Sequence, residues 1–180
     1  MPFLFFIIIC LSSCASLKEA ENRPFAYITD TSKFILLPPG DIEIPMDAHQ
    51  QISISYGPHN FVFNAWVKAD ETGLEMSLFN EMGASAGELS YRDGAVTLKS
   101  SVIPGFIPPE FIVADFQLCF YDPVLLRQSL QKAGLDLETA GEDRRILKGK
   151  NVIIEVEKHE GLVKLVNHHR GYSYTLEGNF

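Results

Sequence analysis

The feature that most constrains the fold is a series of short segments in which apolar and polar residues alternate with a period of two. Gln51–Tyr56 alternates in this way, and the turn signal Gly57-Pro58-His59-Asn60 leads into the apolar segment Phe61–Val67. Similar segments follow, with turn residues between them, at Leu74–Leu78, Leu89–Arg92, Val96–Lys99, Arg145–Lys148, Val152–Val156, Leu162–Val166 and Tyr172–Leu176. Strands at this spacing predict an antiparallel meander in a barrel or a strongly curved sheet, rather than a βαβ fold.

Helical residues are expected only between the two groups of strands. Ile103–Pro109 is an apolar, proline-rich connection, and Glu110–Phe120 is rich in apolar residues with a mixed period. Asp122 is a suitable N-cap for a second helix, with Pro123 in its first turn, and Gly134 is placed to end it. We therefore expect helices that lie across an open end or face of the sheet.

The N-terminus has the pattern of a lipoprotein signal peptide. Phe3–Leu11 is an apolar run, too short to span a bilayer but right for the hydrophobic region of a signal peptide. Leu11-Ser12-Ser13-Cys14 resembles a bacterial lipobox, which implies cleavage before Cys14 and attachment of lipid to its thiol; the alternative is a buried apolar segment with incidental thiols. Ala15 and Ser16 stand where an inner-membrane retention signal has Asp, which implies an outer-membrane location. We predict a signal peptide at 1–13, a lipidated tether at 14–33 and one domain at 34–180.

Composition narrows the function class. Hydrophobic residues make up 46% of the 180 residues and charged ones 21%, enough apolar side chain for an ordered core. The net charge of −8 opposes binding to nucleic acid. Two of the three cysteines lie at the N-terminus and Cys119 stands alone, so no disulfide framework is expected. No cofactor or metal site is predicted, because the histidines lack ligand spacing.

The apolar positions of the strands share one face and are candidates for a ligand cavity. They could line an apolar cavity for acyl chains or simply fill a small barrel, and the residues alone do not decide between these alternatives. The candidate cavity residues, with three from the proline-rich and helical segment, are Phe61, Phe63, Val67, Leu74, Met76, Leu78, Leu89, Tyr91, Val96, Leu98, Phe106, Phe111 and Phe116.

A hydrolase is a weaker alternative. Gly83-Ala84-Ser85-Ala86-Gly87 matches the G-x-S-x-G pattern, but an alternating segment follows it where a nucleophile elbow requires a helix. Enzymatic activity is therefore not expected.

The order of lipobox, strands, proline-rich helical insertion and second meander resembles the LolA/LolB lipoprotein carriers. This resemblance implies a mainly β fold, with a curved antiparallel sheet forming an incomplete barrel and a helical lid between two meanders. Leu78–Gly83 is similar to a loop of the outer-membrane receptor LolB that helps deliver lipoproteins to the membrane, and Met82 takes the place of its apolar residue. Other segments, Pro108–Leu118, Phe120–Pro123 and Gly171–Leu176, are similar to an uncharacterised family of proteobacterial lipoproteins found beside genes for aryl polyene lipids.

These resemblances imply a protein on the periplasmic face of the outer membrane that binds or accepts lipid-linked cargo. Its expected partners are outer-membrane lipid through acylated Cys14, acyl or lipoprotein cargo, and a periplasmic carrier protein. The alternative is a non-enzymatic adaptor lipoprotein that binds a protein of a cell-envelope lipid pathway.

Overall fold

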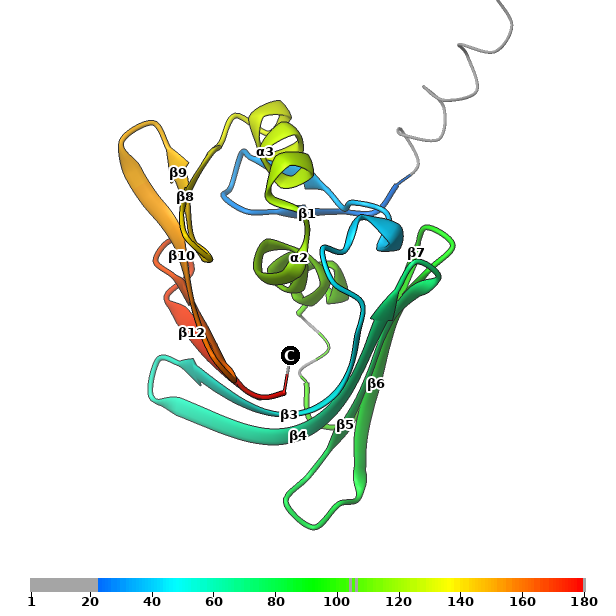
Figure 1. Cartoon of the computed structure of the whole chain (residues 1–180). Helices are drawn as coiled ribbons and strands as arrows, with labels where there is room; N and C mark the ends of the chain where they lie inside the picture. The colour runs from blue at the N-terminus through cyan, green and yellow to red at the C-terminus, as the bar shows by residue number, and fades with distance from the viewer. Residues whose placement is uncertain (1–22, 104, 106, 180) are drawn as a thin grey trace, which may run out of the picture.

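A computed structural model describes residues 23–103, 105 and 107–179 (Figure 1). The predicted signal peptide, Cys14 and the tether as far as residue 22 lie outside the described residues. The strands are β1 (Phe25–Tyr27), β2 (Lys33–Ile35), β3 (Met46–Tyr56), β4 (His59–Asp70), β5 (Gly73–Phe79), β6 (Ser85–Arg92), β7 (Ala95–Ser100), β8 (Asp136–Ala140), β9 (Asp143–Lys148), β10 (Asn151–His159), β11 (Leu162–Asn167) and β12 (Tyr172–Gly178). A 3-10 helix, η1 (Pro39–Asp41), precedes β3, and the helices α2 (Pro109–Phe120) and α3 (Pro123–Lys132) lie between β7 and β8.

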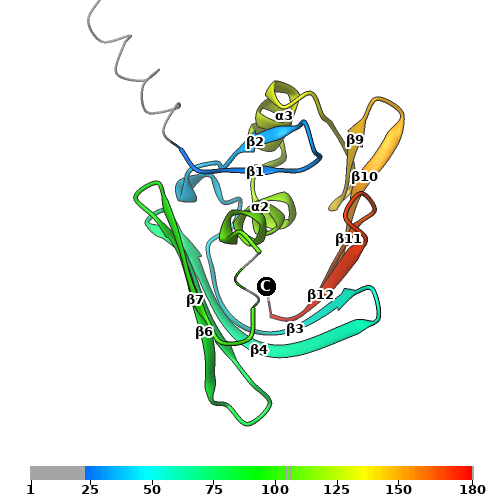
Figure 2. The ribbon, with the colours of Figure 1, turned by 180° about the vertical axis from the view of Figure 1, so that it is seen from behind.

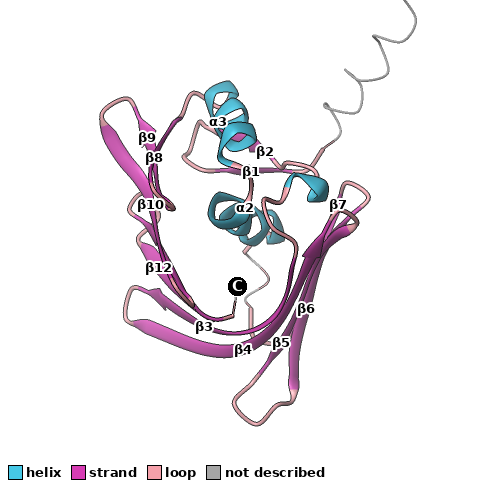
Figure 3. Cartoon of the chain, viewed as in Figure 1, coloured by secondary structure: helices cyan, strands magenta, loops and turns pink. Residues whose placement is uncertain are grey.

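Ten strands form one curved antiparallel sheet. Their order is β7-β6-β5-β4-β3-β12-β11-β10-β9-β8. The two meanders join where β12 pairs with β3, with Tyr172 opposite Tyr56 and Leu176 opposite Ile52. The edge strands β7 and β8 are not paired with each other, so the sheet is unclosed (Figure 3). The predicted mainly β, antiparallel fold with helices between two meanders is therefore confirmed.

The helices occupy the concave side of the sheet. Figures 1 and 2 show α2 between the two walls of the sheet, with α3 and the β1–β2 pair above it. The predicted start of α3 is confirmed, because the Asp122 side chain accepts hydrogen bonds from the backbone amides of Val124 (2.8 Å) and Leu125 (3.0 Å). In α2, residues 113–120 are all buried. A helix surrounded by protein needs no polar face, which explains its mixed hydrophobic period.

The ordered structure extends on the N-terminal side of the predicted domain boundary at 34, into the last part of the predicted tether. β1 pairs with β2, and Ala26 and Ile28 are almost completely buried. The polar residues between the strands form a turn, in which the Ser32 amide donates to Thr29 Oγ1 over 3.2 Å. Polar residues such as Thr29 accept hydrogen bonds from the backbone amides of a turn. In the sequence, a polar turn of this kind looks the same as a flexible tether.

The hydrophobic core lies within residues 26–176, as one cluster formed by the sheet, both helices and the β1–β2 pair. Among the described residues, every strand pairing lies within residues 25–178. A chain that begins at Ala15 keeps all of these contacts and is therefore expected to fold on its own. Within the described residues, no helix is both long enough and apolar enough to cross a membrane.

Candidate functional site

Most predicted cavity residues meet on the concave face, where α2 packs against them. Val96, Leu98 and Phe111 are partly buried at the margin of this core. The others in the cluster are buried: Val67, Leu74, Met76, Leu78, Leu89, Tyr91 and Phe116. At these positions the side chains belong to one hydrophobic cluster with residues of α2. Contact between these residues and a ligand remains a prediction.

Two of the predicted cavity residues lie beyond the part of the sheet that α2 covers. Phe61 is 42% exposed and Phe63 is partly exposed, and their rings stack with centroids 6.4 Å apart. Both share the concave face of β4 with Val67, because residues of equal parity on a strand share a face. The predicted Phe106 lies outside the described residues.

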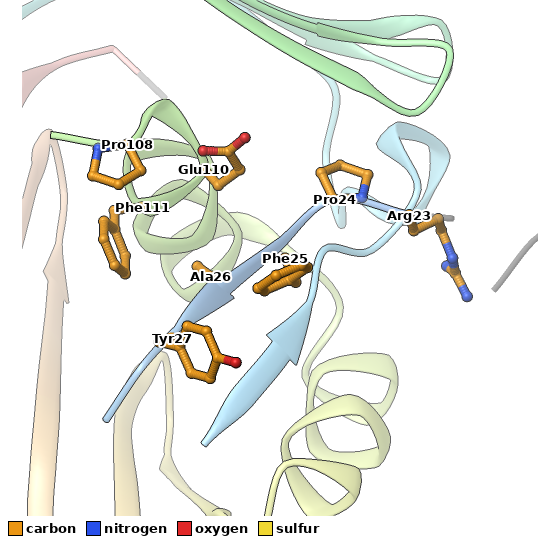
Figure 4. A pocket seen from close by; sticks show the side chains of 8 residues that line it. All are labelled: Arg23, Pro24, Phe25, Ala26, Tyr27, Pro108, Glu110 and Phe111. Atoms are coloured by element: carbon orange, nitrogen blue, oxygen red, sulfur yellow. The ribbon is translucent and has the colours of Figure 1, made fainter. Parts of the chain in front are cut away.

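An open pocket of about 480 Å³ lies between β1 and the first turn of α2 (Figure 4). Phe25, Tyr27 and Phe111 contribute aromatic rings, and Arg23 and Glu110 contribute opposite charges. The full lining is Arg23, Pro24, Phe25, Ala26, Tyr27, Pro108, Glu110 and Phe111. Sequence reasoning found only Phe111, because the other side of the pocket comes from the segment assigned to the tether. The strands that hold these residues have only three residues each, too few for a recognisable alternation.

Arg170, in the turn between β11 and β12, contacts two residues that line this pocket. Its guanidinium lies 4.5 Å from the centroid of the Phe111 ring, and Nη2 donates to the carbonyl oxygen of Tyr27 over 2.6 Å. Its Nε is buried without a hydrogen-bond partner, and no ion pair among the described residues involves Arg170. The positive charge of Arg170 therefore lies directly beside Phe111, one of the aromatic residues that line the pocket.

Asp115 anchors α2 to the sheet one helical turn after Phe111. The Tyr172 hydroxyl donates to Asp115 Oδ2 over 2.5 Å. Burial raises the pKa of Asp115 to about 7, against the lowering effects of the Tyr172 hydrogen bond and the charge of Arg170. This acid therefore lies in a buried contact between α2 and β12 rather than in solvent.

Two further polar side chains fix α2 in place. Arg144 Nη1 donates to the carbonyl oxygens of Leu118 (3.0 Å) and Tyr121 (2.8 Å), and Nη2 pairs with Glu43 Oε2 at 3.1 Å. Gln117 is fully buried and bonds both backbone groups of Leu37, accepting from the amide over 2.9 Å and donating to the carbonyl over 2.8 Å. The helix is therefore held through polar contacts at both its middle and its C-terminal end.

Met82 lies at the tip of the β5–β6 loop and is 89% exposed. Asn80 organises this loop, because its Oδ1 accepts from the amides of Met82 (3.0 Å) and Ala84 (2.9 Å). Gly83 has a φ of +77°, a conformation that favours glycine. An Asn turn thus gives the loop a defined shape.

The alternative chemical motifs are not assembled into sites. Ser85 begins strand β6, so the strand-to-helix turn of a hydrolase elbow is absent at this position. His168 pairs with Glu155 at 2.8 Å, and His169 with Asp30 at 3.4 Å. In the part of the chain that is described, no three His, Cys, Asp or Glu side chains are placed to hold a metal ion.

The comparison with known families identifies one match. A family described as Protein of unknown function (DUF3261) matches residues 47–178. The chain belongs to this family. The DUF3261 match begins at the second residue of β3 and ends with β12, so it includes almost all of the ten-stranded sheet, with Asp115, Arg170 and Tyr172. β1, which forms the other side of the pocket, precedes the matched residues. No curated protein matches the chain.

Proposed function

We propose that this DUF3261 protein is a LolA/LolB-like lipoprotein, anchored to the outer membrane through acylated Cys14, that binds or accepts acyl-bearing cargo. The observation that carries the proposal is the unclosed sheet with an apolar concave face that a helix covers. A closed barrel would fill its interior from its own strands. In this sheet the strands pair with one another and not with α2, so displacement of α2 would break no strand pairing.

The connection to α2 suits a lid. Pro108 and Pro109 restrict the chain directly before the helix, while Gly105 lies further upstream in the same connection. Glu110, Phe111 and Ile112 are only partly buried, in contrast to residues 113–120. Motion of α2 about this connection would expose the concave residues to an acyl chain, with about 0.8 kcal/mol gained for each buried methylene.

Arg170 and the pocket indicate the chemistry of the cargo. Phe25, Tyr27 and Phe111 offer aromatic contact to an alkyl or polyene chain. The Arg170 guanidinium lies 4.5 Å from the centroid of the Phe111 ring, and its positive charge would attract a carboxylate or phosphate at this end of the pocket. We infer that the preferred cargo is an acyl chain with an anionic head. In this proposal the exposed Met82 loop contacts the membrane during release.

A test of this proposal is titration of the domain 15–180 with dansyl-labelled undecanoic acid. Arg170→Gln should raise the dissociation constant about tenfold, since it removes a charged hydrogen-bond donor. Arg170→Lys keeps the charge and should retain most of the affinity. The matched control is Arg145→Gln, which removes an arginine whose side chain is 62% exposed, and this variant should bind as the wild type does. Equal loss of affinity in the Arg145 and Arg170 variants would contradict the assigned role of Arg170.

An adaptor for a protein partner is the second candidate function. The observation that favours it is the packing of α2 against the concave residues, which leaves the interior filled. An adaptor should reject the dansyl probe in every variant and should retain α2 in its packed position.

A further inference from the structure

A cation and a buried acid contact neighbouring positions of α2. Phe111 and Asp115 are four residues apart on this helix, so their side chains are neighbours on one face. Arg170 lies over the Phe111 ring, and Tyr172, two residues further along the chain, donates to Asp115 Oδ2. The positive charge of Arg170 acts on Asp115. Even so, neither residue takes part in an ion pair among the described residues.

The present contacts of Arg170 leave one of its hydrogen-bond donors unused. Nη2 donates to the carbonyl oxygen of Tyr27, which fixes the guanidinium beside the pocket. Nε is buried and has no hydrogen-bond partner in the part of the chain that is described. A buried donor cannot reach a ligand in the open pocket, but it is available to an acid inside the protein. Asp115, which is only 9% exposed, is the buried acid on the helix face that Arg170 contacts.

The charge state of Asp115 determines whether it needs this cation. A buried carboxylate is costly unless a cation or hydrogen-bond donors accompany it. Tyr172 supplies one donor, and Arg170 can supply both a second donor and the opposite charge. A protonated Asp115 needs no cation and leaves the charge of Arg170 to the pocket. An ionised Asp115 would neutralise that charge.

The surroundings of Asp115 leave this role to Arg170. Burial raises the pKa of the titratable side chains beside it on α2 and β12, so these groups are neutral near pH 7: Cys119, Tyr172 and Tyr174. Charged side chains from the other elements around α2 lie at the surface, in the pocket or near the C-terminal end of the helix. They are Lys99 and Lys164, then Arg23 and Glu110, then Arg144 and Lys158.

We propose that Asp115 regulates the binding of anionic cargo by competing with the cargo head for Arg170. This inference rests on the proposed function, because it concerns the charge that would attract the head. When Asp115 is protonated, the guanidinium stays beside Phe111 and attracts the anion. When Asp115 releases its proton to solvent, the guanidinium pairs with the carboxylate and leaves the Tyr27 carbonyl. Cargo is therefore held at lower pH and released as pH rises.

Titration with dansyl-labelled undecanoic acid from pH 6 to pH 8.5 tests this regulation in the domain 15–180. The carboxylate of the probe stays ionised over this range, so a change in affinity comes from the protein. Burial raises the pKa of Asp115 to about 7, so the acid passes from neutral to ionised within the same range. The dissociation constant of the wild type should rise about tenfold, to the value of Arg170→Gln. Asp115→Asn should bind at every pH as the wild type does at pH 6.

Two further variants separate this role from a purely structural one. Tyr172→Phe removes a hydrogen bond that favours the carboxylate, so the loss of affinity should move to higher pH. His169→Gln is the matched control, because histidine ordinarily changes charge in this range and His169 precedes Arg170 in the chain. His169 pairs with Asp30 at 3.4 Å, and its replacement should leave the pH dependence of binding unchanged.

The outcomes distinguish this inference from cargo binding itself. A wild type that binds the probe equally at all pH values would overturn the regulation and leave cargo binding intact. Persistence of the pH dependence in Asp115→Asn, or its loss in His169→Gln, would also overturn the regulation. A wild type that rejects the probe at every pH would contradict the proposed function and this inference with it. Circular dichroism at each pH verifies that all variants are folded.

Discussion

Arg144→Met should lower the free energy of unfolding by about 3 kcal/mol, because the buried carbonyl oxygens of Leu118 and Tyr121 would lose the hydrogen bonds that Arg144 donates to them. Arg144 is only 4% exposed and reaches across the core to the last turn of α2. The carbonyl groups of Leu118 and Tyr121 lie at the negative end of the helix dipole, so they interact favourably with a cation. Methionine keeps an unbranched apolar chain in place of the aliphatic part of arginine and donates no hydrogen bonds.

The neighbouring arginine provides the control for this prediction. Arg145 lies on the opposite face of β9 and pairs with Glu155 at 3.4 Å, with 62% of its side chain exposed. Arg145→Met should change stability by less than about 1 kcal/mol, as is usual for surface ion pairs. Urea unfolding followed by circular dichroism measures both variants. Similar values for the two would show that the contact between Arg144 and α2 contributes little.

Asp115→Asn should change the pH dependence of stability. The folded-state pKa of Asp115 is about 7, mainly because of burial, compared with 3.8 for an unperturbed carboxyl. Between these values the folded protein keeps a proton that the unfolded chain releases, so the contribution of Asp115 to stability falls as pH rises from about 4 to 7. Asparagine does not ionise. From pH 4 to pH 8, the stability of the variant relative to the wild type should increase by about 4 kcal/mol.

A second substitution tests the same pair from the other side. Tyr172 donates to the Asp115 carboxylate, a hydrogen bond that lowers the pKa of Asp115. Tyr172→Phe should therefore reduce stability more at pH 8 than at pH 4. Urea unfolding at the two pH values measures both variants. If the difference between Asp115→Asn and wild type is the same at pH 4 and pH 8, the carboxyl of Asp115 is not protonated in the folded state at neutral pH.

The long strands were predictable from the sequence because each alternates over several residues and ends at a turn signal. The Asp93-Gly94 turn illustrates this, since both residues have positive φ between β6 and β7. The short strands β1 and β2 were not predicted, because three residues are too few to establish a period. β8 was also missed, since its charged residues are those of a solvated edge.

The polar contacts of the candidate site could not be derived from sequence. Arg170-Gly171 reads as a turn, and nothing local indicates that Arg170 reaches Phe111 and Tyr27. Asp115 could be singled out as an acid in an apolar segment, but its partner Tyr172 is far along the chain. The contact between Asp115 and Tyr172 forms because β12 pairs with β3 and lies beside α2. Local sequence patterns do not specify this long-range strand pairing.

Native mass spectrometry of the domain 15–180, purified from bacterial cells and followed by lipid analysis under denaturing conditions, tests cargo binding most directly. A protein that binds acyl cargo should retain an acyl-bearing molecule of defined mass, released on denaturation, and Arg170→Gln should retain less of it. A domain that is compact and ligand-free, and that also rejects the dansyl acyl probe, would contradict cargo binding and favour the adaptor function.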